Sequence, residues 1–203
     1  MAHPSDKIAA LIGSRICHDL INPVGAVSNG LELLQMAGVP RSPELSLLTE
    51  SAAQATARIR LLRLAFGNAG GGQAVAAAEL RDILAATHGT GRLKVDWQAD
   101  GTHPRGAVKA VLLALLCAET ALPAGGRISV ARTAGEGWDV HAAGARIAAD
   151  PALWRILEGA PAPATLPPAA VQFLLLPDAC TTAGLGCAVT QGDEELRIAL
   201  RAP

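Results

Sequence analysis

Apolar residues recur in steps of three and four along roughly the first seventy residues, with polar residues between them. The first series is Cys17, Leu20, Val24, Val27, Leu31 and Leu34, and the second is Leu45, Leu48, Ala52, Ala55, Ile59, Leu62 and Phe66. This spacing is typical of helices that pack side by side as in coiled coils. It predicts one helix from an N-cap near Ser5 to Met36, and a second helix that begins near Ser42-Pro43-Glu44, where a capping residue precedes a proline and an acidic residue.

Further apolar residues lie outside these two series, at Ile21, Leu47, Leu61 and Leu64. Two helices that pack only on each other cannot remove all of this surface from water. A four-helix bundle can, and here it requires the same hairpin from a second subunit. We therefore expect a homodimer, provided that the rest of the chain does not cover the hairpin.

The segment from Gly67 to Ala78 is rich in glycine and then in alanine, which is typical of a linker. We expect a helical hairpin over residues 1–68, a linker over 69–78 and a second domain over 79–203.

Helix and strand patterns alternate in the second domain. Helices are expected at 79–88, 105–122, 150–159 and 171–184, and strands at 92–100, 126–132, 137–144, 185–191 and 195–201, with a turn at 133–137. The predicted fold class is therefore α+β, a helical hairpin followed by a two-layer α/β sandwich.

Composition excludes several classes of function. The 203 residues carry 17 basic and 18 acidic side chains, for a net charge of −1, which argues against partners such as nucleic acid or a membrane surface. The longest apolar run, from Ala110 to Ala118, is about half of what a membrane-spanning helix needs. The four cysteines have no metal-ligand spacing, and we expect free thiols in a cytoplasmic protein.

The first helix carries a polar pair, His18-Asp19, and then Pro23, which removes a helical hydrogen bond. His18 falls beside the apolar series, on a flank that it shares with Arg15, Asn22 and Gly25. An imidazole that is exposed in this way can be approached by another protein. The plainer interpretation is an ordinary surface histidine beside a tolerated proline.

The segment His18-Asp19-Leu20-Ile21-Asn22-Pro23 resembles the dimerisation and phosphoacceptor segment of two-component histidine kinases. The longer string ICHDLINPVGAVSNGLELL, residues 16–34, more closely resembles the ChpT-type histidine phosphotransferases of alphaproteobacterial phosphorelays. The resemblance implies that a dimeric hairpin presents His18 as phosphoryl acceptor and donor. It also implies that a degenerate kinase-ATPase-like domain follows without binding nucleotide.

By this resemblance, His18 takes a phosphoryl group from the receiver domain of a hybrid histidine kinase and passes it to the receiver domain of a response regulator. Arg15 is expected to offset phosphoryl charge, Asn22 to bond the ring or the phosphoryl oxygens, and Asp19 to assist proton transfer. Receiver docking is expected at the face that carries Ile21, Gly25 and Asn29. No cofactor is expected on this chain, because the Mg²⁺ of such transfers would lie in the receiver.

Three features of a kinase-type ATP site are missing from the second domain. Cys117 stands where an asparagine would bind Mg²⁺, and a thiol is a poor ligand for that ion. Residues 142–147 lack the aspartate and the second glycine of a DxGxG turn. The Gly184-Leu185-Gly186 segment follows a helix instead of preceding one, which favours a helix stop over a phosphate loop.

Two alternatives stay open from the sequence. One is an autophosphorylating, ATP-dependent histidine kinase, and the other is a dimeric adaptor without catalysis. The remaining histidines, His3, His88, His103 and His141, share no ligand spacing and are expected in loops or at strand ends, and the three tryptophans are expected in the core.

Overall fold

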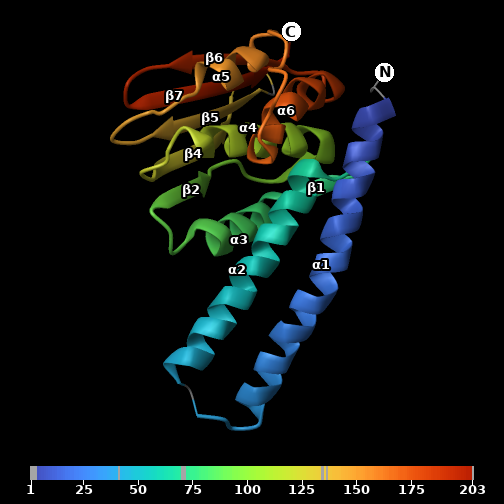
Figure 1. The fold of residues 1–203 in the computed structure, drawn as a ribbon, viewed down its shortest axis with the longest axis vertical. Coiled ribbons are helices and arrows are strands. Elements are labelled where there is room, and N and C mark those ends of the chain that lie inside the picture. Colours follow the sequence, from blue (N-terminus) through green and yellow to red (C-terminus); the bar gives the residue numbers. More distant parts are fainter. Residues whose placement is uncertain (1–3, 41, 70–71, 134, 136, 203) are drawn as a thin grey trace.

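In the computed structural model, a two-helix stem extends from an α/β domain (Figure 1). The structure describes residues 4–40, 42–69, 72–133, 135 and 137–202, with side chains from residue 11 onward. The stem consists of α1 (Pro4–Met36) and α2 (Pro43–Phe66). Ser42 caps α2, since its hydroxyl accepts a hydrogen bond of 3.2 Å from the Leu45 N–H, as expected. Ser5, in contrast, lies inside α1 and not at its N-cap.

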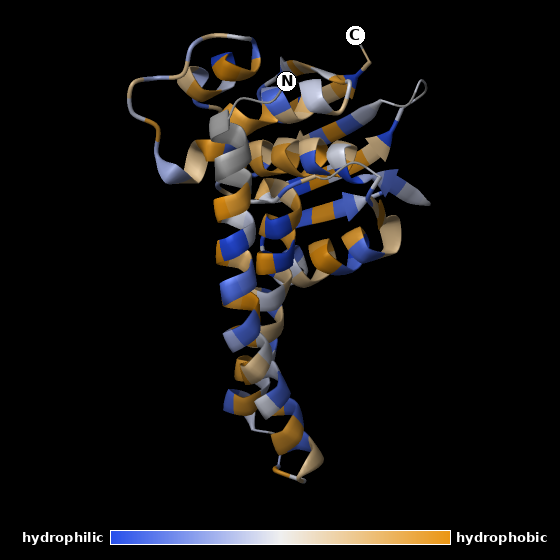
Figure 2. Ribbon diagram, turned by 90° about the vertical axis from the view of Figure 1, so that its right-hand side faces the viewer, coloured by the Kyte–Doolittle hydropathy of each residue, from blue (hydrophilic) through white to orange (hydrophobic). Residues whose placement is uncertain are grey.

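The two apolar series of the stem divide into two stripes. Cys17 and Leu31 on α1, and Ala52 and Ile59 on α2, are buried between the helices. Four other positions stay open, namely Leu20, Val27 and Leu34 on α1 and Leu48 on α2, which are 46–56 % exposed. Apolar bands are visible along both stem helices in Figure 2. One hairpin alone therefore leaves part of its coiled-coil pattern in water.

The last turns of α2 belong to the core of the second domain. Leu61 and Ala65 are fully buried and Leu64 is 8 % exposed, in one cluster with side chains of the second domain. The Arg105 Nη2 donates a hydrogen bond of 3.1 Å to the Arg63 carbonyl. The condition attached to the predicted homodimer is therefore met only in part, because the chain's own second domain covers Leu61 and Leu64.

The expected ten-residue linker is shorter in the structure. Residues 74–76 form strand β1 (Ala74–Ala76), which pairs antiparallel with β3 (Thr102–Pro104). Val75 is 4 % exposed, and helix α3 begins at Ala77. Part of the segment 69–78 is thus a structural element of the second domain, which small residues allow because the backbones can approach closely.

The second domain is a five-stranded sheet with helices on one face (Figure 1). Its further elements are α3 (Ala77–His88), β2 (Leu93–Trp97), α4 (Arg105–Thr120), β4 (Gly126–Arg132), β5 (Trp138–Ala143), α5 (Pro151–Leu157), η2 (Pro168–Ala170), α6 (Val171–Thr182), β6 (Gly186–Gln191) and β7 (Glu195–Arg201). The strand order is β2-β4-β5-β7-β6, with β2 parallel to β4 and the other pairs antiparallel. The expected turn at 133–137 includes residues 134 and 136, which lie outside the described residues.

Alternation along the strands produces the two layers. Ile128, Val130, Val140 and Ile198 are fully buried toward the helices, while the residues between them face solvent. All three tryptophans are 5 % exposed or less, which confirms that they are core residues. The α+β class, with a helical hairpin and an α/β sandwich, is likewise confirmed, and the pairing of two hairpins stays a prediction.

Candidate functional site

His18 projects from the outer flank of α1 into solvent. Its side chain is 71 % exposed, whereas that of its neighbour Cys17 is buried against α2. Successive helical residues point about 100° apart, so His18 cannot share the buried stripe of Cys17. Gly13 lies against Phe66: a methyl group added at Gly13 would lie 3.5 Å from the Cβ of Phe66. This half of α1 is therefore beside the end of α2. The imidazole is therefore presented near the junction of stem and second domain.

Two neighbouring side chains form a chain of contacts with the ring. The Nε of Arg15 donates to Oδ2 of Asp19 at 2.7 Å, and Oδ1 of Asp19 lies 3.2 Å from Nδ1 of His18. The hydrogen bond from Arg15, and then the one with His18, lower the pKa of the Asp19 carboxyl below its ordinary value. A carboxylate beside Nδ1 favours the tautomer with the proton on that nitrogen, which leaves the lone pair on Nε2.

The other predicted site residues follow His18 along the same flank. Asn22 is exposed and Ile21 is half-buried, about one helical turn away. Gly25 is half-buried, and a Cβ placed on it would meet no heavy atom within 4 Å. Asn29 is exposed and lies about three turns from His18, or about 16 Å along the axis. The structure thus brings Arg15, His18 and Asp19 into contact and spreads the remaining residues along one face.

A groove of about 370 Å³ lies further down this flank, between the stem and α3. From α1 it is lined by Ser28, Leu31 and Glu32, from α2 by Thr49, Ala53, Thr56, Ala57 and Arg60, and from α3 by Asp82, Ile83 and Ala86. Ser28 and Glu32 lie within about 80° of His18 around the helix, so the groove opens on the side of the imidazole.

Cys117 and Gly184, which were expected not to take part in nucleotide binding, each have a structural role. Cys117 is fully buried in the core, and burial raises the pKa of its thiol well above the ordinary value. Gly184 has φ +71°, and hydrogen bonds run from its N–H to the Thr181 carbonyl and from the Leu185 N–H to the Cys180 carbonyl. This is a Schellman motif, and it confirms that Gly184 ends α6.

A network between the stem and the second domain was not foreseen from the sequence. Glu119 on α4 accepts from Arg58 of α2 at 3.4 Å and contacts the Nε2 of His88, at the end of α3. Burial alone would raise the pKa of Glu119, but the bonds to His88 and Arg58 outweigh it, and the pKa is lowered. A local sequence pattern could not predict this network, because Glu119 is 31 residues from His88 and 61 residues from Arg58 in the chain.

The expected placement of the histidines in loops or at strand ends is wrong, because His88 is the last residue of α3, while His103 lies within β3 and His141 within β5. His88 is 7 % exposed in the Glu119 network, and His103, on the short strand β3, is 6 % exposed. The His103 ring lies 6.0 Å from that of Trp97 and 4.7 Å from that of Trp138. Burial, and then the charges of Arg132 and Arg81, lower the pKa of His103. His3 lies outside the described residues.

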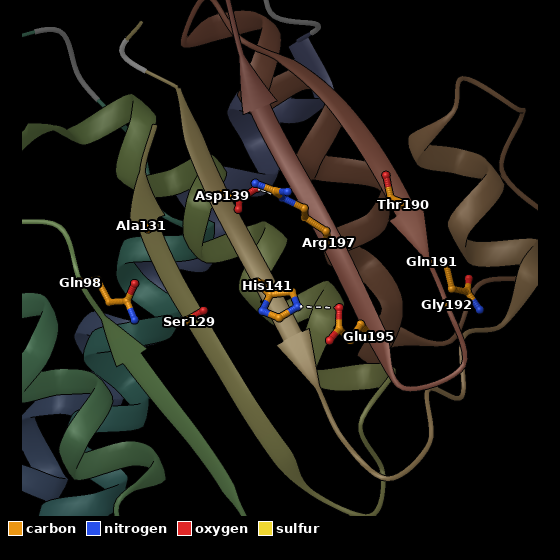
Figure 3. Close-up of a pocket in the computed structure, with 10 residues that line it drawn as sticks. All are labelled: Gln98, Ser129, Ala131, Asp139, His141, Thr190, Gln191, Gly192, Glu195 and Arg197. Carbon is orange, nitrogen blue, oxygen red and sulfur yellow. Dashed lines mark hydrogen bonds and ion pairs between the residues drawn. The ribbon is translucent and has the colours of Figure 1, made fainter. Parts of the chain in front are cut away.

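A polar hollow of about 610 Å³ lies on the open face of the sheet (Figure 3). Two polar contacts cross it, the Arg197–Asp139 ion pair at 2.6 Å and a contact between His141 and Glu195 at 3.4 Å. None of the residues predicted for the functional site lines this hollow. The described residues contain no group of three or more His, Cys, Asp or Glu side chains that could hold a metal ion. Among the same residues, no helix has the length and apolar character that crossing a membrane requires.

Comparisons with known proteins agree with this architecture. The family "Histidine phosphotransferase C-terminal domain" matches residues 77–195, so the chain belongs to the histidine phosphotransferases. This confirms the resemblance stated from the sequence.

Two individual relatives extend the comparison. A curated relative, protein phosphotransferase ChpT of Brucella abortus (strain 2308), is 37 % identical over 125 residues, which are 61 % of this chain and 59 % of the relative. The match thus spans somewhat more than half of that relative's length. A solved structure of a bacterial phosphotransferase superposes with a TM-score of 0.71 at 26 % identity, and the match covers 99 % of this chain and 98 % of that one. The stem and the second domain therefore occur together in a known phosphotransferase fold.

Proposed function

We propose that this chain is a phosphorelay histidine phosphotransferase in which His18 accepts a phosphoryl group from the aspartate of one receiver domain and donates it to the aspartate of another. The geometry of His18 carries the proposal. The ring is 71 % exposed, and its Nδ1 lies beside the Asp19 carboxylate, so that Nε2 is the nucleophilic nitrogen. Transfers of this kind depend mainly on positioning and charge stabilisation.

The receiver domain docks along the flank of α1 that begins at His18. Ile21, Gly25 and Asn29 lie on this flank, and the open space above Gly25 admits close approach of another backbone. The groove between the stem and α3 continues the same surface. Donor and acceptor are the receiver domains of a hybrid histidine kinase and of a response regulator, and neither nucleic acid nor a membrane is a partner.

The chain itself binds no cofactor for this reaction. Mg²⁺ belongs to the acidic pocket of the receiver domain, and nucleotide has no place in the second domain, where Cys117 is buried and Gly184 ends a helix. The relay takes place in the cytoplasm, whose reducing conditions suit the free thiols at Cys17, Cys117, Cys180 and Cys187.

Two copies of the hairpin associate through the exposed stripe. Leu20, Val27 and Leu34 point about 180° away from His18 around α1, so a four-helix bundle would bury them and leave both imidazoles open. Val27→Glu should therefore convert a dimer into monomers in light scattering. Leu33→Glu is the matched control, because Leu33 is 64 % exposed on the same helix but lies outside the stripe. A wild-type monomer would contradict the proposal.

Transfer is tested with a receiver domain that carries radiolabelled phosphoaspartate. Wild-type protein should become labelled and pass the label to a second receiver, whereas His18→Gln should take up none and keep its oligomeric state. His141→Gln, which changes a half-buried histidine on the sheet, should behave as wild type. Labelling from ATP alone would favour a kinase, and absence of phosphohistidine in the wild type would favour a non-catalytic adaptor.

A further inference from the structure

Arg15 contacts the Asp19 carboxylate on the side away from His18. The guanidinium binds Oδ2 at 2.7 Å, while the other oxygen, Oδ1, faces the His18 ring at 3.2 Å. One carboxylate thus connects a fixed cation to the imidazole. Arg15 and Asp19 are one helical turn apart, a spacing at which opposite charges on a helix pair readily.

We propose that Arg15 is a positioning residue that acts through Asp19, by holding the carboxylate so that Oδ1 accepts the Nδ1–H of His18 and the Nε2 lone pair faces the incoming phosphoryl group. This inference rests on the proposed function. It assigns Arg15 a role in the free protein, before any phosphoryl group arrives. The arrangement follows the general logic in which a nucleophile is oriented by a second group and that group by a third.

The arrangement has a defined effect on the transfer step. The Nε2 lone pair forms the N–P bond while the P–O bond to the receiver aspartate breaks, and the aspartate carboxylate leaves with the electron pair. The ring becomes positively charged and still carries its proton on Nδ1. Asp19, kept ionised by Arg15, accepts the hydrogen bond from that proton and stabilises the charge that develops. Without Arg15 the carboxylate can turn toward solvent, and the ring can adopt either tautomer.

The Asp19 carboxylate needs a positioning residue because it lies on the exposed surface of the helix. Arg15 and Asp19 side chains are 76 % and 49 % exposed, so packing does not hold the carboxylate. A single carboxylate on a helix surface competes with water for each of its bonds, and a bond on each oxygen restricts its rotation. The lowered pKa of Asp19 agrees with a carboxylate held by two hydrogen bonds, the one from Arg15 first and the one with His18 second.

The test compares Arg15→Ala, Arg15→Lys and a control, Arg155→Ala, which removes an exposed arginine from α5. Ring ¹⁵N shifts of His18, measured at a pH at which the imidazole is neutral, report the ratio of the two neutral tautomers. The wild type and the control should show mainly the Nδ1–H form. Arg15→Ala should lose this preference and accept the phosphoryl group about three- to tenfold more slowly, which corresponds to the loss of one exposed hydrogen bond. Arg15→Lys should keep part of both properties, because an ammonium can still pair with Asp19 but without the planar fork.

The outcomes separate this inference from the function on which it rests. If Arg15→Ala keeps the wild-type ring shifts and transfer rate, the positioning role is refuted. If the rate falls while the tautomer ratio stays unchanged, Arg15 acts on the phosphoryl group or on the receiver, and the inference is again wrong. If the wild type forms no phosphohistidine, the proposed function fails, while the ring shifts still show whether Arg15 controls the tautomer.

Discussion

Leu61 connects the stem to the second domain, and its truncation gives a sharp test of that connection. The residue lies on α2, is fully buried and belongs to the same cluster as the core of the second domain. Leu61→Ala removes three carbon atoms from a site enclosed by helices, where the surroundings can close the cavity only in part. Substitutions of this kind cost about 2–5 kcal/mol, and we expect about 3 kcal/mol here. For a chain of this length that corresponds to a fall in Tm of about 6–12 °C.

Tryptophan fluorescence makes the test specific. The chain has three tryptophans and no tyrosine, and all three tryptophans lie in the second domain. Thermal unfolding should be followed by this fluorescence and by circular dichroism, which also reports the stem helices. Because the end of α2 is part of the second domain's core, Leu61→Ala should lower both midpoints together. Leu47→Ala is the control, since Leu47 is 65 % exposed on the same helix and its loss should cost less than about 0.5 kcal/mol.

Two results would refute this reasoning. An unchanged fluorescence midpoint in Leu61→Ala, with a lowered dichroism midpoint, would mean that the stem unfolds independently of the second domain. Equal effects of Leu61→Ala and Leu47→Ala would mean that the burial of Leu61 contributes nothing specific.

Three further predictions concern stability. Glu119→Gln removes the carboxylate charge that pairs with Arg58 and contacts His88, and it should lower the free energy of unfolding in urea by about 1–3 kcal/mol, whereas Glu50→Gln, on the exposed surface, should change it little. Burial is the main cause that lowers the pKa of His103 in the folded state. At mildly acidic pH the unfolded state therefore binds a proton on His103 more readily than the folded state does. The stability that neutral His103 contributes is complete above about pH 6.5 and is lost as the pH falls toward the lower folded pKa. His103→Gln should flatten that dependence in urea titrations between pH 7 and pH 5, and an unaltered slope would contradict it. Gly184→Ala forces a side chain into φ +71° and should cost about 1–2 kcal/mol in thermal unfolding, while Gly106→Ala, with only an ordinary 4.0 Å contact, should be neutral or stabilising.

The sequence by itself determined the parts of this protein that depend on local order. The three-and-four spacing specified both stem helices, and the Ser42-Pro43 pair specified the start of the second, because helical hydrogen bonds and caps join residues only a few positions apart. The strands that alternate between core and solvent were also predicted, since side chains along a strand point to opposite faces. The His18 segment could be read as a candidate site because its residue types are adjacent in the chain.

Tertiary structure decided which surfaces meet. The β1–β3 pair and the contact of His88 with Glu119 join residues that are far apart, and such pairings leave no periodic trace in the sequence. Only packing showed that Leu61, which lies outside both apolar series, is buried against the second domain, while Leu20, which belongs to the first series, faces solvent. The Asp19 carboxylate, with one oxygen toward Arg15 and the other toward His18, makes only local contacts within α1, but the sequence does not specify its orientation, because several rotamers of an exposed carboxylate fit the same sequence.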